Sequence, residues 1–134
     1  MKLTWWGQLD PEISDMVGKT FKTVKATEDE LIFTGSCGTF TFYHNQDCCE
    51  TVYIESIVGD LEDLIGEVIL SAEVSEGETP KGWTPDEYTD SYTWTFYKFA
   101  TRKGYVDVRW FGESNGYYSE SVDLKWEPPI KDQK

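Results

Sequence analysis

The sequence predicts a mostly β fold, either an antiparallel β-sandwich or a partly open barrel of about eight strands with two short helices. Several short segments alternate apolar and polar residues with the period of two that a half-buried strand requires. Glycine-containing turns separate these segments, and aromatic residues, which favour strands, make up 16% of the chain. The 134 residues fit one domain. We expect residues 1–126 to form it and residues 127–134 to be a flexible tail.

The first half of the chain contains two helix signals between its strands. Asp10 followed by Pro11 is typical of a helix start and predicts a short helix over 11–17. Asp60 is expected to cap a second helical turn over 60–65. Strands are expected at 19–26, 31–34, 39–44, 51–58 and 67–74. In the fourth strand, alternation places Val52, Ile54 and Val58 on one side, and in the fifth it aligns Val68, Leu70, Ala72 and Val74.

The last third of the chain has the clearest β pattern. Residues 92–101 are aromatic and β-branched, residues 105–111 alternate strictly, and residues 118–126 are expected to form the final strand. Turns at Lys103-Gly104 and Ser114-Asn115-Gly116 predict two hairpins, because Asn-Gly tolerates the positive φ of tight turns. The polar segment 76–91 is expected to be the longest exposed loop, with Trp83 packed back onto the body.

The chain is strongly acidic, with a formal net charge of −13. Such a surface repels nucleic acid and anionic membranes, so we expect direct binding to neither. The acidity is interpreted either as simple solubility or as an acidic face that competes with nucleic acid for a basic protein.

The expected location is the cytoplasm. The start Lys2-Leu3-Thr4-Trp5-Trp6 does not match a signal peptide, and no window approaches the roughly 20 apolar residues of a membrane span. The three cysteines are an odd number, and in a reducing compartment we expect free thiols.

The segment His44-Asn45-Gln46-Asp47-Cys48-Cys49-Glu50 is the first candidate site. Strand parity places His44 with the apolar residues before it and Glu50 with those after it, so a hairpin would bring both side chains to one buried side. One interpretation is a satisfied polar cluster that fixes the hairpin, with Glu50 or Asp47 as the partner of His44. A second is a zinc site from His44, Cys48 or Cys49, and Cys37 or Asp47, although adjacent cysteines in an extended chain point apart. A third is a Cys48 or Cys49 nucleophile with His44 as its base, oriented by Asp47 or Glu50.

The second candidate site surrounds the predicted turn at 114–116. Arg109 lies on the same face as Asp107, which predicts either a cross-strand ion pair or a rim where Arg109 meets an anion and an aromatic ring stacks. The residues expected to bind a ligand or partner are Trp94, Arg109, Glu113, Asn115, Tyr117 and Tyr118.

Four stretches, HNQDCCE (44–50), VYIESIVGDLEDLIG (52–66), YTWTFYKFAT (92–101) and GYVDVRWFGESNGYYSESV (104–122), together resemble a small domain family of unknown function found in bacteriophages and bacteria. That family has a signature close to H-D-Q-D-C-C-E, and the resemblance covers roughly residues 17–124. Asn45 stands where the signature has Asp, which weakens any role that needs a carboxylate there. The resemblance implies no activity. It implies a phage or prophage gene expressed in the bacterial cytoplasm.

These observations predict that the chain is a non-enzymatic phage accessory protein that binds a host component, for example a defence factor, and that it uses no cofactor. Two alternatives remain: a binder of a small nucleotide-like signal, and a metal- or cysteine-dependent enzyme centred on residues 44–50. A host protein is the expected partner, and the chain is expected to be a monomer or a homodimer.

Overall fold

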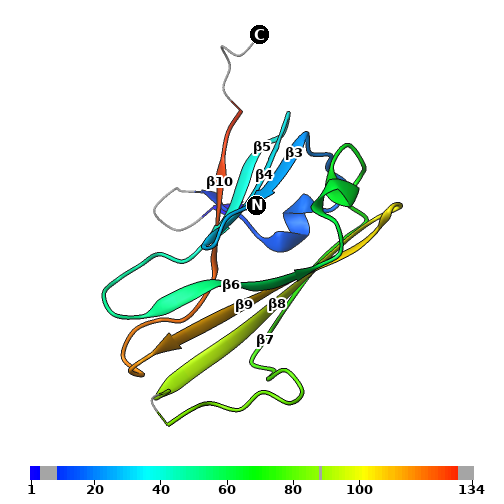
Figure 1. Cartoon of the computed structure of the whole chain (residues 1–134). Coiled ribbons are helices and arrows are strands. Elements are labelled where there is room, and N and C mark those ends of the chain that lie inside the picture. Colours follow the sequence, from blue (N-terminus) through cyan, green and yellow to red (C-terminus); the bar gives the residue numbers. More distant parts are fainter. Residues whose placement is uncertain (4–8, 88, 130–134) are drawn as a thin grey trace.

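Two four-stranded antiparallel sheets lie face to face in the computed structural model, which describes residues 1–3, 9–87 and 89–129 (Figure 1). The first sheet has the order β10-β5-β4-β3 and the second the order β6-β9-β8-β7, with a separate β1-β2 pair. The strands are β1 (Lys2–Leu3), β2 (Leu9–Asp10), β3 (Thr23–Ala26), β4 (Glu30–Gly35), β5 (Gly38–Tyr43), β6 (Thr51–Val58), β7 (Ser71–Glu76), β8 (Ser91–Thr101), β9 (Gly104–Ser114) and β10 (Asp123–Glu127). The predicted mostly β sandwich is confirmed, and the sheets do not close into a barrel.

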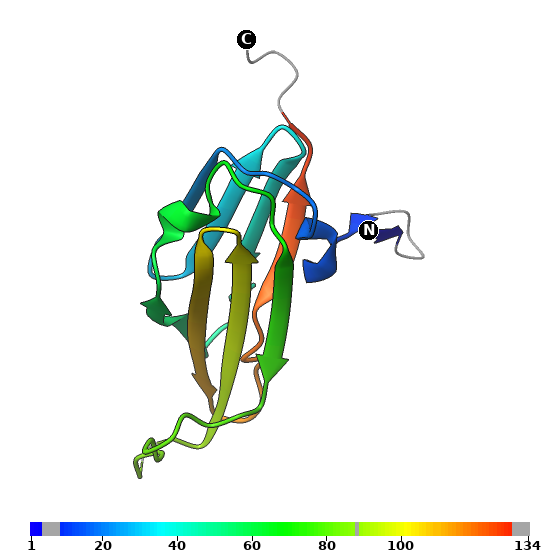
Figure 2. The same cartoon turned by 90° about the vertical axis from the view of Figure 1, so that its right-hand side faces the viewer.

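The core lies between the two sheets, which Figure 2 shows as front and back layers. Rings from opposite sheets meet there, with centroids 5.0 Å apart for Phe33 and Phe99 and 4.7 Å apart for Phe42 and Tyr97. The alternation of β9 is also confirmed, because Val106, Val108 and Trp110 are buried on this inner side. The burial of large aromatic side chains is therefore the main stabilising contribution.

The two predicted helices are single 3-10 turns, η1 (Ile13–Met16) and η2 (Leu61–Leu64). The expected start of the first was wrong: Asp10 belongs to β2, and Glu12 is the N-cap, with its backbone N–H donating to the Asp15 carboxylate at 2.7 Å. Asp60 does cap η2, because its side chain accepts a hydrogen bond from the Glu62 N–H.

A bulge in β6 corrects the expected facing of that strand. The register against β9 shifts between Ile54 and Ser56, so the parity of the strand reverses after Glu55. As a result Ile57, and not Val58, packs against the core, and Val58 is 65% exposed.

The strands expected at 67–74 and 118–126 are shorter than predicted. Strand β7 begins at Ser71, and before it Ile69 is fully buried while Val68 and Leu70 are exposed, the reverse of the expected facing. Strand β10 begins at Asp123 and still includes Glu127, which pairs with Thr39. Of the expected flexible tail, residues 130–134 lie outside the described residues.

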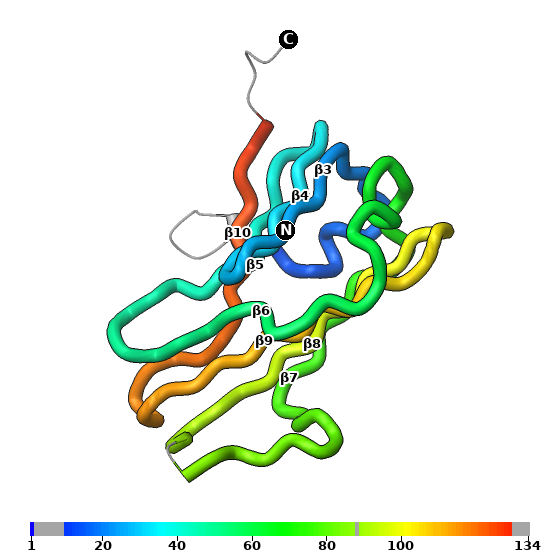
Figure 3. The backbone as a smooth tube through the Cα atoms, in the orientation of Figure 1, coloured from blue at the N-terminus to red at the C-terminus, as the bar shows by residue number. Residues whose placement is uncertain are grey.

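Neither of the two turns near the candidate sites closes a hairpin. Segment 44–50 connects β5 of the first sheet to β6 of the second, and segment 115–122 returns from β9 of the second sheet to β10 of the first. The tube in Figure 3 shows both connections passing between the sheets at the same end of the sandwich. We refer to them as the first crossover (44–50) and the second crossover (115–122).

Candidate functional site

The carboxylate of Glu50 holds the first crossover together. It is 4% exposed and accepts hydrogen bonds from the side chain of Gln46 at 2.8 Å and from the backbone N–H of Cys48 at 2.9 Å. The N–H of Asp47 contacts both carboxylate oxygens, at 3.3 and 3.2 Å. The chain therefore wraps around one buried carboxylate, which satisfies the polar groups that this sheet-to-sheet passage would otherwise leave unpaired.

His44 joins the two crossovers. Its Nε2 lies 3.0 Å from Oε2 of Glu50, and its Nδ1 lies 2.7 Å from the carbonyl oxygen of Ser121. The His44 side chain is 3% exposed. Each ring nitrogen therefore has an oxygen atom within hydrogen-bond distance, one from each crossover.

The surroundings of Glu50 favour its ionised form. Burial by itself would raise the pKa of this carboxyl group, but the hydrogen bonds from His44 and from the backbone of residues 47–50 outweigh it and lower the pKa from 4.5 to about 2. The carboxylate is therefore charged at neutral pH. Its contact with His44 confirms the pairing expected from strand parity, although through a crossover instead of a hairpin.

This geometry argues against the nucleophile and zinc interpretations. Both nitrogens of His44 are occupied by oxygen acceptors, so the ring has no free nitrogen to accept a thiol proton or to bind a metal ion. The expectation of free thiols at Cys48 and Cys49 was wrong: the two adjacent residues form a disulfide, while Cys37 is free. Within the described residues, no group of three or more His, Cys, Asp or Glu side chains is arranged to hold a metal.

The second crossover has a buried carboxylate of its own. Glu120 is 8% exposed, and it accepts hydrogen bonds from the hydroxyl groups of Thr93 at 2.8 Å and Ser114 at 2.6 Å. Asn115 turns the chain by accepting from the N–H of Tyr117 at 3.0 Å. The side chain of Tyr117 is left 84% exposed. A braced loop therefore presents a large aromatic side chain to solvent.

Three loops meet at this end of the sandwich (Figure 1). One groove of about 330 Å³ is lined by residues from the first crossover and β6, from the 77–90 loop, and from the end of β9 and the second crossover. Its lining is Cys49, Thr51, Asp86, Thr89, Asp90, Glu113, Ser114 and Asn115. We call the surface formed by segments 44–50, 77–87, 89–90 and 113–122 the loop end.

The six residues expected to form one binding site are divided between two surfaces. Glu113, Asn115, Tyr117 and Tyr118 belong to the loop end, and the Tyr117 and Tyr118 rings lie 5.0 Å apart. Trp94 and Arg109 lie instead on the outer face of the second sheet, where the Arg109 guanidinium is 5.2 Å from the Trp94 ring.

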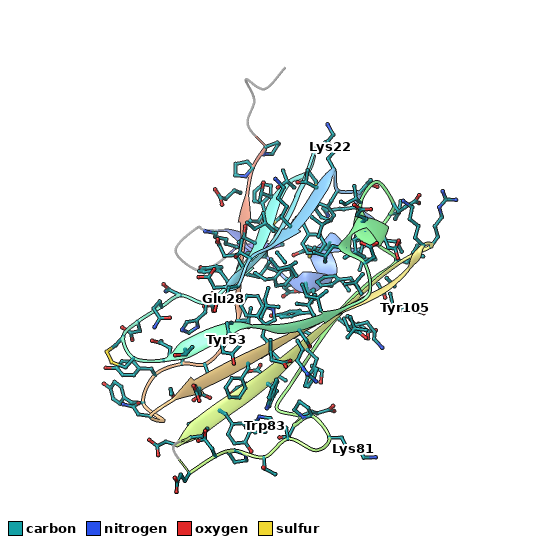
Figure 4. The ribbon with its side chains drawn as sticks, viewed as in Figure 1. Lys22, Glu28, Tyr53, Lys81, Trp83 and Tyr105 are labelled. Carbon is teal, nitrogen blue, oxygen red and sulfur yellow. A yellow bond between two sulfur atoms is a disulfide. The ribbon has the colours of Figure 1, made fainter. Side chains whose placement is uncertain are left out.

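Arg109 already has a partner on this outer face. Its Nε donates to Oε2 of Glu55 at 2.6 Å, and this hydrogen bond lowers the pKa of Glu55. The predicted cross-strand ion pair is therefore present, and it joins Arg109 of β9 to Glu55, the bulge residue of β6. Trp94 is 4% exposed, because Trp83 from the 77–90 loop packs against it with ring centroids 5.2 Å apart. Figure 4 shows Trp83 returning to the outer face of the sheet, as expected.

Sequence reasoning missed Gln46 and Glu120 as structural residues. Gln46 lies in a polar stretch that is typical of a solvent-exposed loop, and it is exposed although its side chain donates to Glu50. Glu120 lies inside the strand expected at 118–126, where alternation places it on the same side as Val122, Leu124 and Trp126. That parity was the available signal for its burial.

The fold and the loop end define a β-sandwich domain with two buried carboxylates that brace the sheet-to-sheet connections. The model of the family described as Domain of unknown function (DUF7448) matches residues 14–124, and the chain belongs to this family. Searches of curated proteins and of solved structures find no significant match. No helix in the described part of the chain has the length and apolarity needed to cross a membrane.

Proposed function

We propose that this protein is a non-enzymatic phage or prophage accessory protein that works in the bacterial cytoplasm by binding a basic host protein, such as a defence factor, through its loop end. The single observation that carries the proposal is the convergence of three braced loops into one acidic surface beside an exposed aromatic side chain.

Charge supports a basic partner. The segments of the loop end contain eight carboxylates and a single lysine: Asp47, Glu50, Glu78, Asp86, Glu87, Asp90, Glu113 and Glu120, with Lys81. Two of these carboxylates, Glu50 and Glu120, are buried, while Asp47, Asp86, Glu87 and Asp90 are exposed. Exposed charges of one sign accelerate the association with an oppositely charged partner and discriminate against acidic ones.

Tyr117 supplies the apolar contact area that charge alone does not provide. Tyrosine is enriched among the residues that dominate binding energy at interfaces. The turn at Asn115 and the buried Glu120 fix the backbone on either side of Tyr117, so that binding would order little additional chain.

Affinity capture from a bacterial lysate tests the proposal with two matched double variants. Glu87→Gln with Asp90→Asn removes two charges from the loop end, and Glu62→Gln with Glu127→Gln removes two exposed charges elsewhere. We expect a basic protein to be retained by the wild type and by the second variant. It should be lost from the first variant and, for the wild type, at ~1 M salt, where the screening length is about 3 Å. Equal retention by both variants would contradict the proposal.

A second candidate function, binding of a small nucleotide-like ligand, is favoured by a groove on the outer face of the second sheet. The groove has a volume of about 460 Å³, and its lining includes Phe96, Lys98 and Arg109. However, Glu73, Glu78 and Asp107 also line the groove. It would therefore suit a ligand with both positive and negative groups better than a polyanion. A thermal-shift screen with nucleotides would test this candidate, and the stabilisation should be absent from Arg109→Met.

A further inference from the structure

Cys48 and Cys49 form a disulfide at the tip of the first crossover. Both residues are exposed, and Figure 4 shows the sulfur–sulfur bond at the outer end of the loop. A disulfide in this position adds little to the stability of the fold, because the chain segment that it closes contains only the two bonded residues. Its accessibility to solvent suggests chemistry instead.

The backbone beneath the sulfurs is held by Glu50. The N–H of Cys48 donates to Oε1 of Glu50 at 2.9 Å, the N–H of Asp47 donates to the same carboxylate, and His44 fixes the carboxylate from the other side. None of these bonds involves a sulfur atom. We therefore expect the two sulfurs to remain close together after the bond between them opens, which favours re-closure.

The charge around the pair is negative. Cys49 lines the same groove as Asp86, Asp90 and Glu113, and Asp47 is the residue next to Cys48. Charges in one groove act on an approaching ion within the screening length, which is about 10 Å at 0.1 M ionic strength. An anionic reagent is therefore repelled from Cys49, and a cationic one is attracted.

We propose that the Cys48–Cys49 pair is a thiol-exchange site that selects cationic or neutral thiols over anionic ones. A thiolate attacks Sγ of Cys49, because Cys49 is the cysteine that lines the acidic groove, and a new disulfide forms between the reagent and Cys49. The bond between the two cysteines breaks, and its electron pair leaves on Sγ of Cys48, which takes a proton from water. The protein is then held to the thiol-bearing molecule by one covalent bond.

The mixed disulfide can react further in two ways. The Cys48 thiolate can attack Cys49 again, which expels the original thiolate and restores the closed pair. Alternatively, a second thiolate attacks the reagent's sulfur, so that two thiols are oxidised to their disulfide while the protein gains two electrons and two protons. Because the first step needs only a thiol, a basic protein with an accessible cysteine is the kind of partner that this site would trap. The exchange chemistry itself does not depend on the proposed partner binding.

The test uses a Cys37→Ser background, so that Cys48 and Cys49 are the only cysteines. The protein is first incubated with bis(2-hydroxyethyl) disulfide, freed of reagent, denatured and alkylated, and its intact mass is measured. We expect no alkyl adduct, because both sulfurs are in the closed pair. Two adducts, or two bound mercaptoethanol groups, would overturn the proposal.

Selectivity is measured with cysteamine (cationic), mercaptoethanol (neutral) and thioglycolate (anionic). Each rate constant for opening the pair is divided by the rate constant of the same thiol with bis(2-hydroxyethyl) disulfide, which removes differences in intrinsic reactivity. At low salt we expect the normalised value for cysteamine to exceed that for thioglycolate about tenfold, and the difference to shrink to about twofold at ~1 M salt.

Two variants locate the source of this selectivity. Asp90→Asn with Glu113→Gln removes two charges from the groove that contains Cys49, and we expect it to reduce the difference between the thiols. Glu62→Gln with Glu127→Gln makes the same change in net charge elsewhere and should leave the difference intact. Equal normalised rates for all three thiols in the unsubstituted Cys37→Ser protein would overturn the selectivity. A failed lysate capture would leave these results unaffected.

Discussion

The ring of His44 contacts the carboxylate of Glu50 through Nε2 at 3.0 Å, although the two residues flank a passage from one sheet to the other. Because Nδ1 of the same ring contacts the carbonyl of Ser121 at 2.7 Å, this single side chain connects both crossovers. His44 and Glu50, which the sequence offered as a catalytic base and its orienting group, therefore hold the two crossovers of the loop end in place.

Removing the His44 contacts should destabilise the protein substantially. His44→Phe keeps a ring of similar size but deletes both ring nitrogens, so it removes the contact with the buried carboxylate of Glu50 and the contact with the carbonyl oxygen of Ser121. We expect a loss of ~3 kcal/mol in the free energy of unfolding, measured by urea denaturation. A loss below ~0.5 kcal/mol would show that the ring is not a structural link.

Acid should weaken the fold through Glu50. Its pKa is about 2 in the folded protein and 4.5 ordinarily, so the unfolded chain binds the proton more readily. The stability that this difference contributes is fully present above pH 4.5 and is lost as the pH falls toward 2.

Thermal melts between pH 7 and pH 3 measure this dependence. Glu50→Gln should be less stable than the wild type at pH 7, because an amide presents a donor to the N–H groups of Asp47 and Cys48. Its melting temperature should also fall less steeply with acidification. Parallel curves for the two proteins would mean that another carboxyl group causes the acid sensitivity.

Gly112 should not tolerate a larger side chain. A Cβ atom at this position would lie 2.7 Å from the carbonyl oxygen of Glu120 and 3.2 Å from Cγ2 of Val52. Gly112→Ala therefore forces the second crossover away from β9, and we expect it to cost ~2 kcal/mol. Urea denaturation measures the cost, and a neutral substitution would show that the crossover packs loosely there.

Trp83 should anchor the 77–90 loop. Its ring packs against Tyr92 and Phe111 with centroid distances of 4.7 and 5.5 Å, and it is partly buried. We expect Trp83→Ala to cost ~2 kcal/mol and Trp83→Phe less than half of that, because the smaller ring keeps part of the contact. Hydrogen exchange in residues 77–87 should accelerate in Trp83→Ala, and unchanged exchange would show that the loop is held by other contacts.

The strand content could be predicted because local alternation encodes it. Val106, Val108 and Trp110 are inward as the period of two requires. The partition of the strands into two sheets could not be predicted, since a turn-like segment has the same composition whether it closes a hairpin or crosses between sheets. The bulge at Glu55 was equally hidden, because one unpaired residue leaves no mark in the sequence.

The candidate site could be predicted only in part. Strand parity correctly predicted that His44 lies beside Glu50. The expectation that the side chains of Cys48 and Cys49 point apart was wrong, because the two residues form a disulfide. The burial of Glu120 depends on the hydroxyl groups of Thr93 and Ser114, and the first of these lies 27 residues away in the chain. A hydrogen bond between residues so far apart in the chain depends on the folded structure, so the local sequence around Glu120 does not predict it.

Binding of a basic probe peptide, followed by the backbone amide signals in an NMR titration, tests the central claim most directly. The probe is a decapeptide of lysine, arginine and one tryptophan, compared with its glutamate-containing analogue. We expect chemical-shift changes concentrated in residues 45–49, 84–90 and 113–119, and loss of these changes in Glu87→Gln with Asp90→Asn. Changes spread evenly over the acidic surface, or centred on η2 at the opposite end of β6, would contradict the assignment of the loop end as the binding surface.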